Sequence, residues 1–144
     1  MDIAELTDQD RALVQTAIET ADRLYLHTVQ EVAAAARTAS GHVFSGIGFD
    51  TNSAWADTCG EVAALSCMVA AGHRNLEMIV AVWRDQQGRH FLLPPCGKCR
   101  EVIRSFNRQA WVIVTSRPNH WEIGSIDEPC KVRICDLVPM PWKA

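Results

Sequence analysis

Apolar residues recur every three or four positions between residues 13 and 25, which predicts an amphipathic helix near the start of the chain. Thr7, followed three residues later by Asp10, has the pattern of a helix N-cap. We expect this helix to end near His27. A second helix is predicted over residues 59–72, where the sequence is apolar almost all round and therefore indicates burial on every side.

Strands are predicted where apolar residues run together between turn residues. These runs cover residues 32–37, 42–49, 76–83, 90–93, 111–115 and 121–126. The run at 76–83 is continuously apolar, which is typical of a strand buried on both faces of its sheet. Further helices are expected over 96–106 and, shorter, over 132–138. The order predicts one α/β domain over residues 1–144, a three-layer α-β-α sandwich with one mixed sheet of about five strands.

Composition narrows the class of protein. With 144 residues, 48% of them apolar and 22% charged, the chain fits an ordinary globular domain. A net charge of −3 and the lack of a basic run argue against a nucleic-acid partner. No apolar run is long enough to span a membrane, and the first residues are acidic where a signal peptide would be basic. We therefore expect a cytoplasmic protein without a membrane partner.

The six cysteines fall into two kinds. A disulfide framework belongs to short secreted chains, whereas clustered cysteines in a reducing compartment more often bind metal. Cys67 lies inside the apolar run after Cys59, and we expect it to pack in the core as a small apolar residue. Cys130 and Cys135 have no metal-ligand spacing with it.

Two short segments carry the candidate chemistry, Cys59-Gly60-Glu61 and Pro95-Cys96-Gly97-Lys98-Cys99. They offer three thiolates and one carboxylate, and a catalytic zinc site typically has three protein ligands and one position left for water. Both segments lie at predicted helix starts, where the helix dipole is expected to lower the pKa of a cysteine. Three thiolates leave a zinc ion with a net charge of −1, and the neighbouring Arg100 is our candidate for the cation that offsets it.

This pattern resembles the zinc-dependent nucleoside and nucleobase deaminases, in which His or Cys, any residue and Glu precede Pro-Cys-x-x-Cys. The resemblance covers roughly residues 28–139 and is closest to small cytidine deaminases and blasticidin-S deaminase. It implies that Cys59, Cys96 and Cys99 bind one Zn²⁺ per chain and that Glu61 moves the protons. The implied reaction is hydrolytic deamination of cytidine or deoxycytidine, in pyrimidine salvage, by a homotetramer. Met140 and Trp142, in the tail, are expected either to reach toward a neighbouring site or to pack on their own subunit.

The same resemblance identifies candidate residues that would contact the ribose of a nucleoside substrate. Residues 45–53 occupy the place of a family segment that reads Gly-Val-Asn-Val-Glu-Asn-Ala-Ser. Gly48 stands where an asparagine holds the ribose, and Asp50 stands where a glutamate does so, which makes both candidate substrate-binding positions. If the missing amide limits recognition, asparagine at position 48 should improve cytidine turnover. The family's arginine after the catalytic glutamate is Val62 here, and residues 28–31 contain no aromatic residue to cover the base.

Two alternatives remain open from the sequence. One is the same chemistry on another small aminopyrimidine, such as blasticidin S. The other is a non-catalytic zinc-binding module, in which Cys130, Cys135 or His73 would supply a fourth ligand and Glu61 would have no role.

Overall fold

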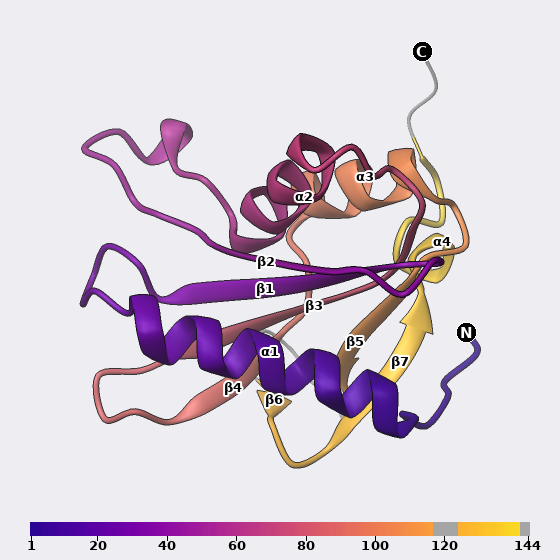
Figure 1. Ribbon diagram of the computed structural model, residues 1–144, viewed down its shortest axis with the longest axis horizontal. Helices are drawn as coiled ribbons and strands as arrows, with labels where there is room; N and C mark the ends of the chain where they lie inside the picture. Colours follow the sequence, from indigo (N-terminus) through magenta and orange to yellow (C-terminus); the bar gives the residue numbers. More distant parts are fainter. Residues whose placement is uncertain (117–123, 142–144) are drawn as a thin grey trace.

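A sheet of seven strands separates one long helix from two shorter ones in a computed structural model of the protein, which describes residues 1–116 and 124–141 (Figure 1). The strands are β1 (Val32–Thr38), β2 (Val43–Ile47), β3 (Leu76–Arg84), β4 (His90–Leu93), β5 (Trp111–Thr115), β6 (Gly124–Ser125) and β7 (Pro129–Arg133). The helices are α1 (Asp8–Leu24), α2 (Gly60–Ala70), α3 (Gly97–Phe106) and α4 (Ile134–Leu137), with a 3₁₀ turn η1 (Ala54–Ala56). No helix in the described part is long and apolar enough to cross a bilayer.

The sheet is mixed, and β3 is its centre. β1 pairs antiparallel with one edge of β3 and carries β2 on its outer side. The other edge of β3 is shared: its first residues pair parallel with β5, and its last residues pair antiparallel with β4. β7 extends the sheet beyond β5, and the short β6 pairs with β4. β4 and β5 therefore follow one another along the same edge of β3. The chain leaves β4 toward α3 at the point where these two strands meet.

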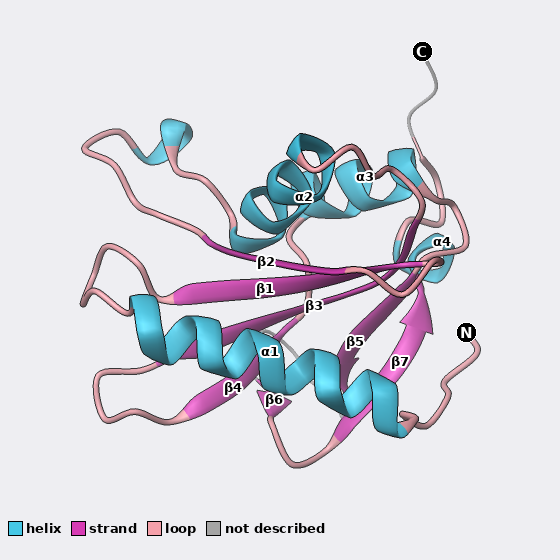
Figure 2. Cartoon of the chain, viewed as in Figure 1, coloured by secondary structure: helices cyan, strands magenta, loops and turns pink. Residues whose placement is uncertain are grey.

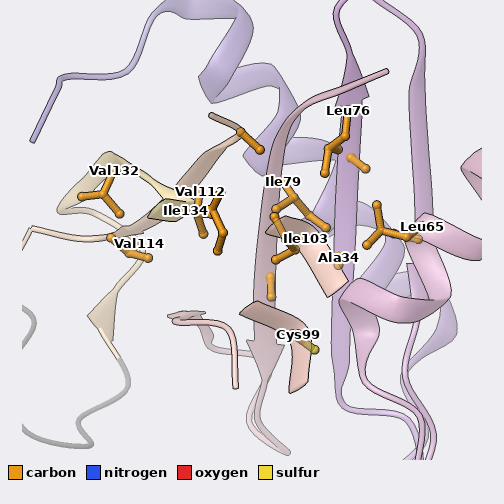
Figure 3. Packing of buried hydrophobic residues seen from close by; sticks show 14 of the residues in the cluster. Ala34, Leu65, Leu76, Ile79, Cys99, Ile103, Val112, Val114, Val132 and Ile134 are labelled. Atoms are coloured by element: carbon orange, nitrogen blue, oxygen red, sulfur yellow. The ribbon is translucent and has the colours of Figure 1, made fainter. Parts of the chain in front are cut away.

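The helices cover both faces of this sheet, with α1 on one side and α2 and α3 on the other (Figure 2). Alternate residues of β1 and β3 point to opposite cores, as the period of a strand requires. Ala34 and Ile79 pack under α2 and α3, whereas Ala35 and Val80 pack under α1. Figure 3 shows the first of these cores, with Cys99 at its margin. The short side chains of β1 let helices approach the sheet closely from both sides.

The first helix begins as its sequence predicts. The Thr7 hydroxyl accepts a hydrogen bond from the backbone N–H of Asp10, and the Asp10 carboxylate accepts one from the N–H of Thr7. Asp10 is buried and also binds the Arg37 guanidinium at 2.8 Å and the Lys131 ammonium at 2.6 Å. This carboxylate therefore links α1 to β1 and β7.

The predicted three-layer architecture is confirmed, and four details are corrected. The sheet has seven strands among the described residues rather than about five. β7 takes the first residues of the helix predicted over 132–138, because these residues alternate between buried and half-buried positions beside β5. Only residues 124–125 of the strand predicted over 121–126 are in a strand, while 121–123 lie outside the described residues, as does Trp142.

The fourth correction concerns α2, which is buried on one face only. Leu65 and Met68 are buried, but Cys67 and Val69 are exposed, so the prediction that Cys67 packs in the core was wrong. An apolar composition almost all round the helix hid its orientation, since Ser66 alone marks the outer face with a polar side chain.

Candidate active site

The first turns of α2 and α3 bring three cysteines together. Cys59 is the N-cap residue of α2 and Cys96 is the N-cap residue of α3, and their sulfur atoms lie 3.8 Å apart. Cys99 lies in the first turn of α3, and its backbone N–H donates to the sulfur of Cys96 at 3.4 Å. All three sulfur atoms lie within 4.8 Å of one another. Segments separated by a strand hairpin in the sequence thus meet at one point.

The cysteine cluster fits a zinc ion. Two thiolates bound tetrahedrally at about 2.3 Å have their sulfur atoms about 3.8 Å apart, which agrees with the spacing of Cys59 and Cys96. Among the described residues, these three form the one group that could hold a metal ion, and the group includes none of Cys130, Cys135 and His73. Three ligands leave a coordination position open, which favours a catalytic over a closed structural site.

The thiols have unequal acidities. Burial raises the pKa of Cys59 and, together with the nearby Glu61 carboxylate, raises that of Cys99. Burial also acts on Cys96, but hydrogen bonds from the backbone and thiol of Cys99 outweigh it and lower the Cys96 pKa. The expectation that a helix N-terminus lowers the pKa of each cysteine was therefore wrong for Cys59 and Cys99. A bound Zn²⁺ would supply the positive charge that thiolates at these buried positions require.

Glu61 lies beside the sulfurs in the first turn of α2 and is only 6% exposed. Burial raises the pKa of its carboxyl group, while the thiol of Cys99 donates a hydrogen bond that partly opposes the shift. A carboxyl group whose pKa is raised by burial holds a proton more readily than one in water, which suits a group that must take up and release protons. The geometry thus permits proton transfer at this position.

Two glycines let α2 approach the sheet closely enough to place Cys59. A Cβ atom on Gly60 would lie 2.7 Å from the carbonyl oxygen of Val32 at the start of β1. A Cβ atom on Gly48 would lie 2.5 Å from the carbonyl oxygen of Thr58 and 2.8 Å from the nitrogen of Gly60. The expectation that asparagine at position 48 improves cytidine turnover is therefore corrected, because the backbone leaves no room for a side chain there. Sequence reasoning missed this role of Gly60, for which the spacing offers no signal.

Asp50 follows directly after the bridge that joins the chain beyond β2 to the residue before Cys59. Phe49 exchanges two backbone hydrogen bonds with Thr58, each 3.0 Å long, one residue before Cys59. The backbone N–H of Asp50 donates to the carbonyl of Val29, and its side chain is exposed. Asp50 is therefore exposed beside the segment that leads to Cys59, and it lies outside the cysteine cluster.

Residues 26–31 join α1 to β1 and lie next to Asp50, whose N–H donates to Val29. Thr28 has a φ of 62°, an uncommon value for a β-branched residue. Its N–H donates to one oxygen of Glu31 at 2.8 Å, and the indole N–H of Trp83 donates to the other at 3.1 Å. This segment contains no aromatic residue, but its Glu31 binds Trp83 of β3. The sequence did not reveal this contact.

Arg100 contacts two backbone carbonyl groups. Its Nε donates to Pro95 at 2.8 Å and its Nη1 donates to Leu137 at 3.2 Å. Its proposed role in offsetting the charge of the zinc site stays a prediction.

Comparisons with known proteins agree with this geometry. Residues 7–115 match a family model described as the cytidine and deoxycytidylate deaminase zinc-binding region. The chain is 30% identical over 113 residues to blasticidin-S deaminase of Bacillus cereus, which covers 76% of this chain and 81% of that protein. It is 27% identical over 71 residues to cytidine deaminase of Mycoplasma genitalium, covering 49% and 52% of the two chains. The crystal structure of cytidine deaminase from Burkholderia pseudomallei superposes with a TM-score of 0.73 at 25% identity, covering 95% of this chain and 100% of that one.

Proposed function

The chain belongs to the family of zinc-dependent cytidine and deoxycytidylate deaminases, and from this premise we propose that its substrate is cytidine or deoxycytidine. It is a zinc-dependent hydrolase that converts the exocyclic amine of a cytosine-type ring to a carbonyl and releases ammonia. The observation that carries the proposal is the meeting of three cysteine sulfurs within 4.8 Å of one another beside a buried glutamate.

We assign the metal ligands to Cys59, Cys96 and Cys99. When bound, zinc supplies a Lewis acid that makes water a nucleophile near neutral pH. Glu61 accepts the proton of the attacking water and delivers it to the ring nitrogen next to the carbon under attack. It then takes the proton of the hydroxyl group now bound to that carbon and passes it to the departing amino group, whose carbon–nitrogen bond breaks as the carbonyl forms. Each turnover consumes one water molecule and releases one ammonia molecule.

The raised pKa of Glu61 supports this assignment. A carboxyl group that is buried at the cluster holds a proton more readily than one in water, and the reaction requires the same group to take up and release a proton. Asp50, exposed beside the segment that leads to Cys59, is proposed to accept a hydrogen bond from a sugar hydroxyl. Gly48 contributes by its lack of a side chain, which lets the backbone of β2 reach Cys59.

The test is ammonia release from cytidine and deoxycytidine by the wild-type protein and by the variants Glu61→Gln and Glu101→Gln. Glu61→Gln is expected to keep its zinc and lose at least about 10³-fold in turnover, near the upper end for general acid–base catalysis. Glu101→Gln alters an exposed carboxylate on α3 and is the matched control, expected to keep its activity. A Glu61→Gln variant with a tenth of wild-type turnover would show that another group moves the protons.

A second candidate substrate is blasticidin S. The relative that bears this name is 30% identical to the chain over 113 residues, and position 48 offers no side chain to hold a ribose. Comparing kcat/KM for cytidine, deoxycytidine and blasticidin S under the same conditions distinguishes the two candidates. Turnover of blasticidin S without turnover of cytidine at millimolar concentration would favour the second.

Assembly and location are proposals as well. A homotetramer is supported by the family resemblance and by exposed apolar residues, among which Trp55 is 89% and Phe49 is 45% exposed. A cytoplasmic location is supported by the clustered cysteines, which more often bind metal in a reducing compartment. A role in pyrimidine salvage follows from the proposed substrate.

A further inference from the structure

Arg100 connects the metal segment, which we define as residues 95–99, to the helix α4. It follows the zinc ligand Cys99 directly, and its backbone N–H donates to the carbonyl of Cys96 at 2.9 Å within α3. Its side chain turns back to the carbonyl of Pro95 and across to the carbonyl of Leu137. One guanidinium group thus joins the residue before the first ligand of this segment to the end of α4.

The contact with Pro95 restricts the peptide group that leads into Cys96. Proline has no N–H, so its carbonyl is the one backbone group through which Pro95 can be held by a hydrogen bond. That carbonyl belongs to the same planar peptide unit as the nitrogen of Cys96. A hydrogen bond to this oxygen therefore restrains the orientation of the peptide group that leads into Cys96.

The other end of the link is itself well anchored. Leu137 is the last residue of α4, where carbonyl groups lack partners within the helix. The helix begins at Ile134, which is fully buried and whose N–H donates to the carbonyl of Ala110 at 2.9 Å. Arg100 thus holds the metal segment against a fixed part of the core.

We propose that Arg100 is a positioning residue, whose two hydrogen bonds to Pro95 and Leu137 orient Cys96 and slow the loss of zinc. The proposal rests on the assignment of Cys96 and Cys99 as ligands. It differs from charge compensation in what it requires of the side chain. A positive charge near the metal can be supplied by lysine, whereas two carbonyls on separate segments require the fork of a guanidinium group.

The experiment measures zinc release from the zinc-loaded, full-length protein into a chromogenic chelator for wild type, Arg100→Lys, Arg100→Gln and Arg104→Lys. Arg104 lies one turn further along α3 and pairs with Glu101 at 3.8 Å, so Arg104→Lys is the matched control. Both Arg100 variants are expected to release zinc about 10–100-fold faster than wild type, as is typical when a residue that supports a metal ligand is lost. The control should release zinc at the wild-type rate.

A second readout covers the case in which an Arg100 variant folds poorly. The rise in melting temperature on adding zinc should be smaller for Arg100→Lys than for wild type and unchanged for Arg104→Lys. The proposal is overturned if Arg100→Lys matches wild type in both measurements while Arg100→Gln loses zinc, because charge alone would then suffice. It is equally overturned if neither Arg100 variant differs from wild type. Neither readout uses turnover, so a failure of the proposed substrate would leave the result intact.

Discussion

At the scale of single residues, the missing side chains of Gly48 and Gly60 matter as much as the thiols. Both lie where the backbone of the sheet meets the first turn of α2, and that turn begins with Cys59. Gly48, which the sequence suggested had lost a contact with substrate, thus contributes to the placing of Cys59.

Gly48→Ala is therefore expected to lower both stability and zinc content. The new Cβ would meet backbone atoms that can move only together with Cys59, and overpacking of this kind typically costs about 1–3 kcal/mol. Gly97→Ala is the comparison, since a Cβ there meets no atom within 4 Å. Urea unfolding and elemental analysis of the two variants check the prediction, and equal losses in both would contradict it.

A second residue-scale prediction concerns Asp10 and pH. Burial alone would raise its pKa, but hydrogen bonds from Lys131, Thr7 and Arg37 lower the pKa from 3.8 to about 2. A carboxylate whose pKa is depressed on folding stabilises the protein above its unfolded pKa, and this contribution is lost as the pH falls from about 4 to about 2. The shift corresponds to about 2 kcal/mol.

Asp10→Asn should therefore lower the free energy of unfolding by about 2 kcal/mol or more at pH 7. The difference between the variant and wild type should shrink as the pH falls through the interval from 4 to 2. Urea titrations of both proteins at pH 7 and pH 3 measure it, and each pair is compared at one pH, so loss of zinc in acid affects both members alike. A difference that stays constant with pH would argue against the buried ion pairs as its source.

At the scale of elements, α2 shows why neighbouring residues in one helix carry different weight. Met68 is fully buried under the helix, while Cys67 faces outward. Met68→Ala should lower the free energy of unfolding by about 2–5 kcal/mol, the usual cost of emptying a buried site. Cys67→Ala should change it by less than about 0.5 kcal/mol. Chemical denaturation of the two variants tests this orientation, and a large effect at Cys67 would show that its side is covered.

The same scale shows what the sequence could predict. Two elements were found within a few residues of their ends: α1, which has a clear contrast between apolar and polar positions, and β3, which is a nearly continuous apolar run between turn residues. α2 lacks that contrast, and β7 is short and begins with Pro129, so neither its type nor its pairing with β5 was evident. The cluster of Cys59, Cys96 and Cys99 was predicted from their chemistry and spacing. The contact of Gly48 with Gly60 and the partners of Arg100 depend on tertiary packing, which local patterns do not encode.

At the scale of the whole molecule, we expect the protein to be a homotetramer. Light scattering coupled to size-exclusion chromatography should then give four times the chain mass of 16.0 kDa at micromolar concentration. Trp55→Ser should reduce the assembled fraction if Trp55, now 89% exposed, lies between subunits. A single peak at the mass of one chain would contradict the assembly.

The spacing of the sulfur ligands along the chain bears on how the protein acquires its metal during folding. Cys96 and Cys99 are three residues apart, whereas Cys59 and Cys96 are separated by 37 residues. Closing the longer loop costs about 2 kcal/mol more in chain entropy than closing the shorter one. A chain still folding should therefore capture zinc first with the nearby pair, and recruit Cys59 only when α2 settles against β1 and β2. The metal would then join α2 and α3 late in folding, when α2 packs against the sheet. Refolding should be faster when zinc is present from the start than when it is added at the end.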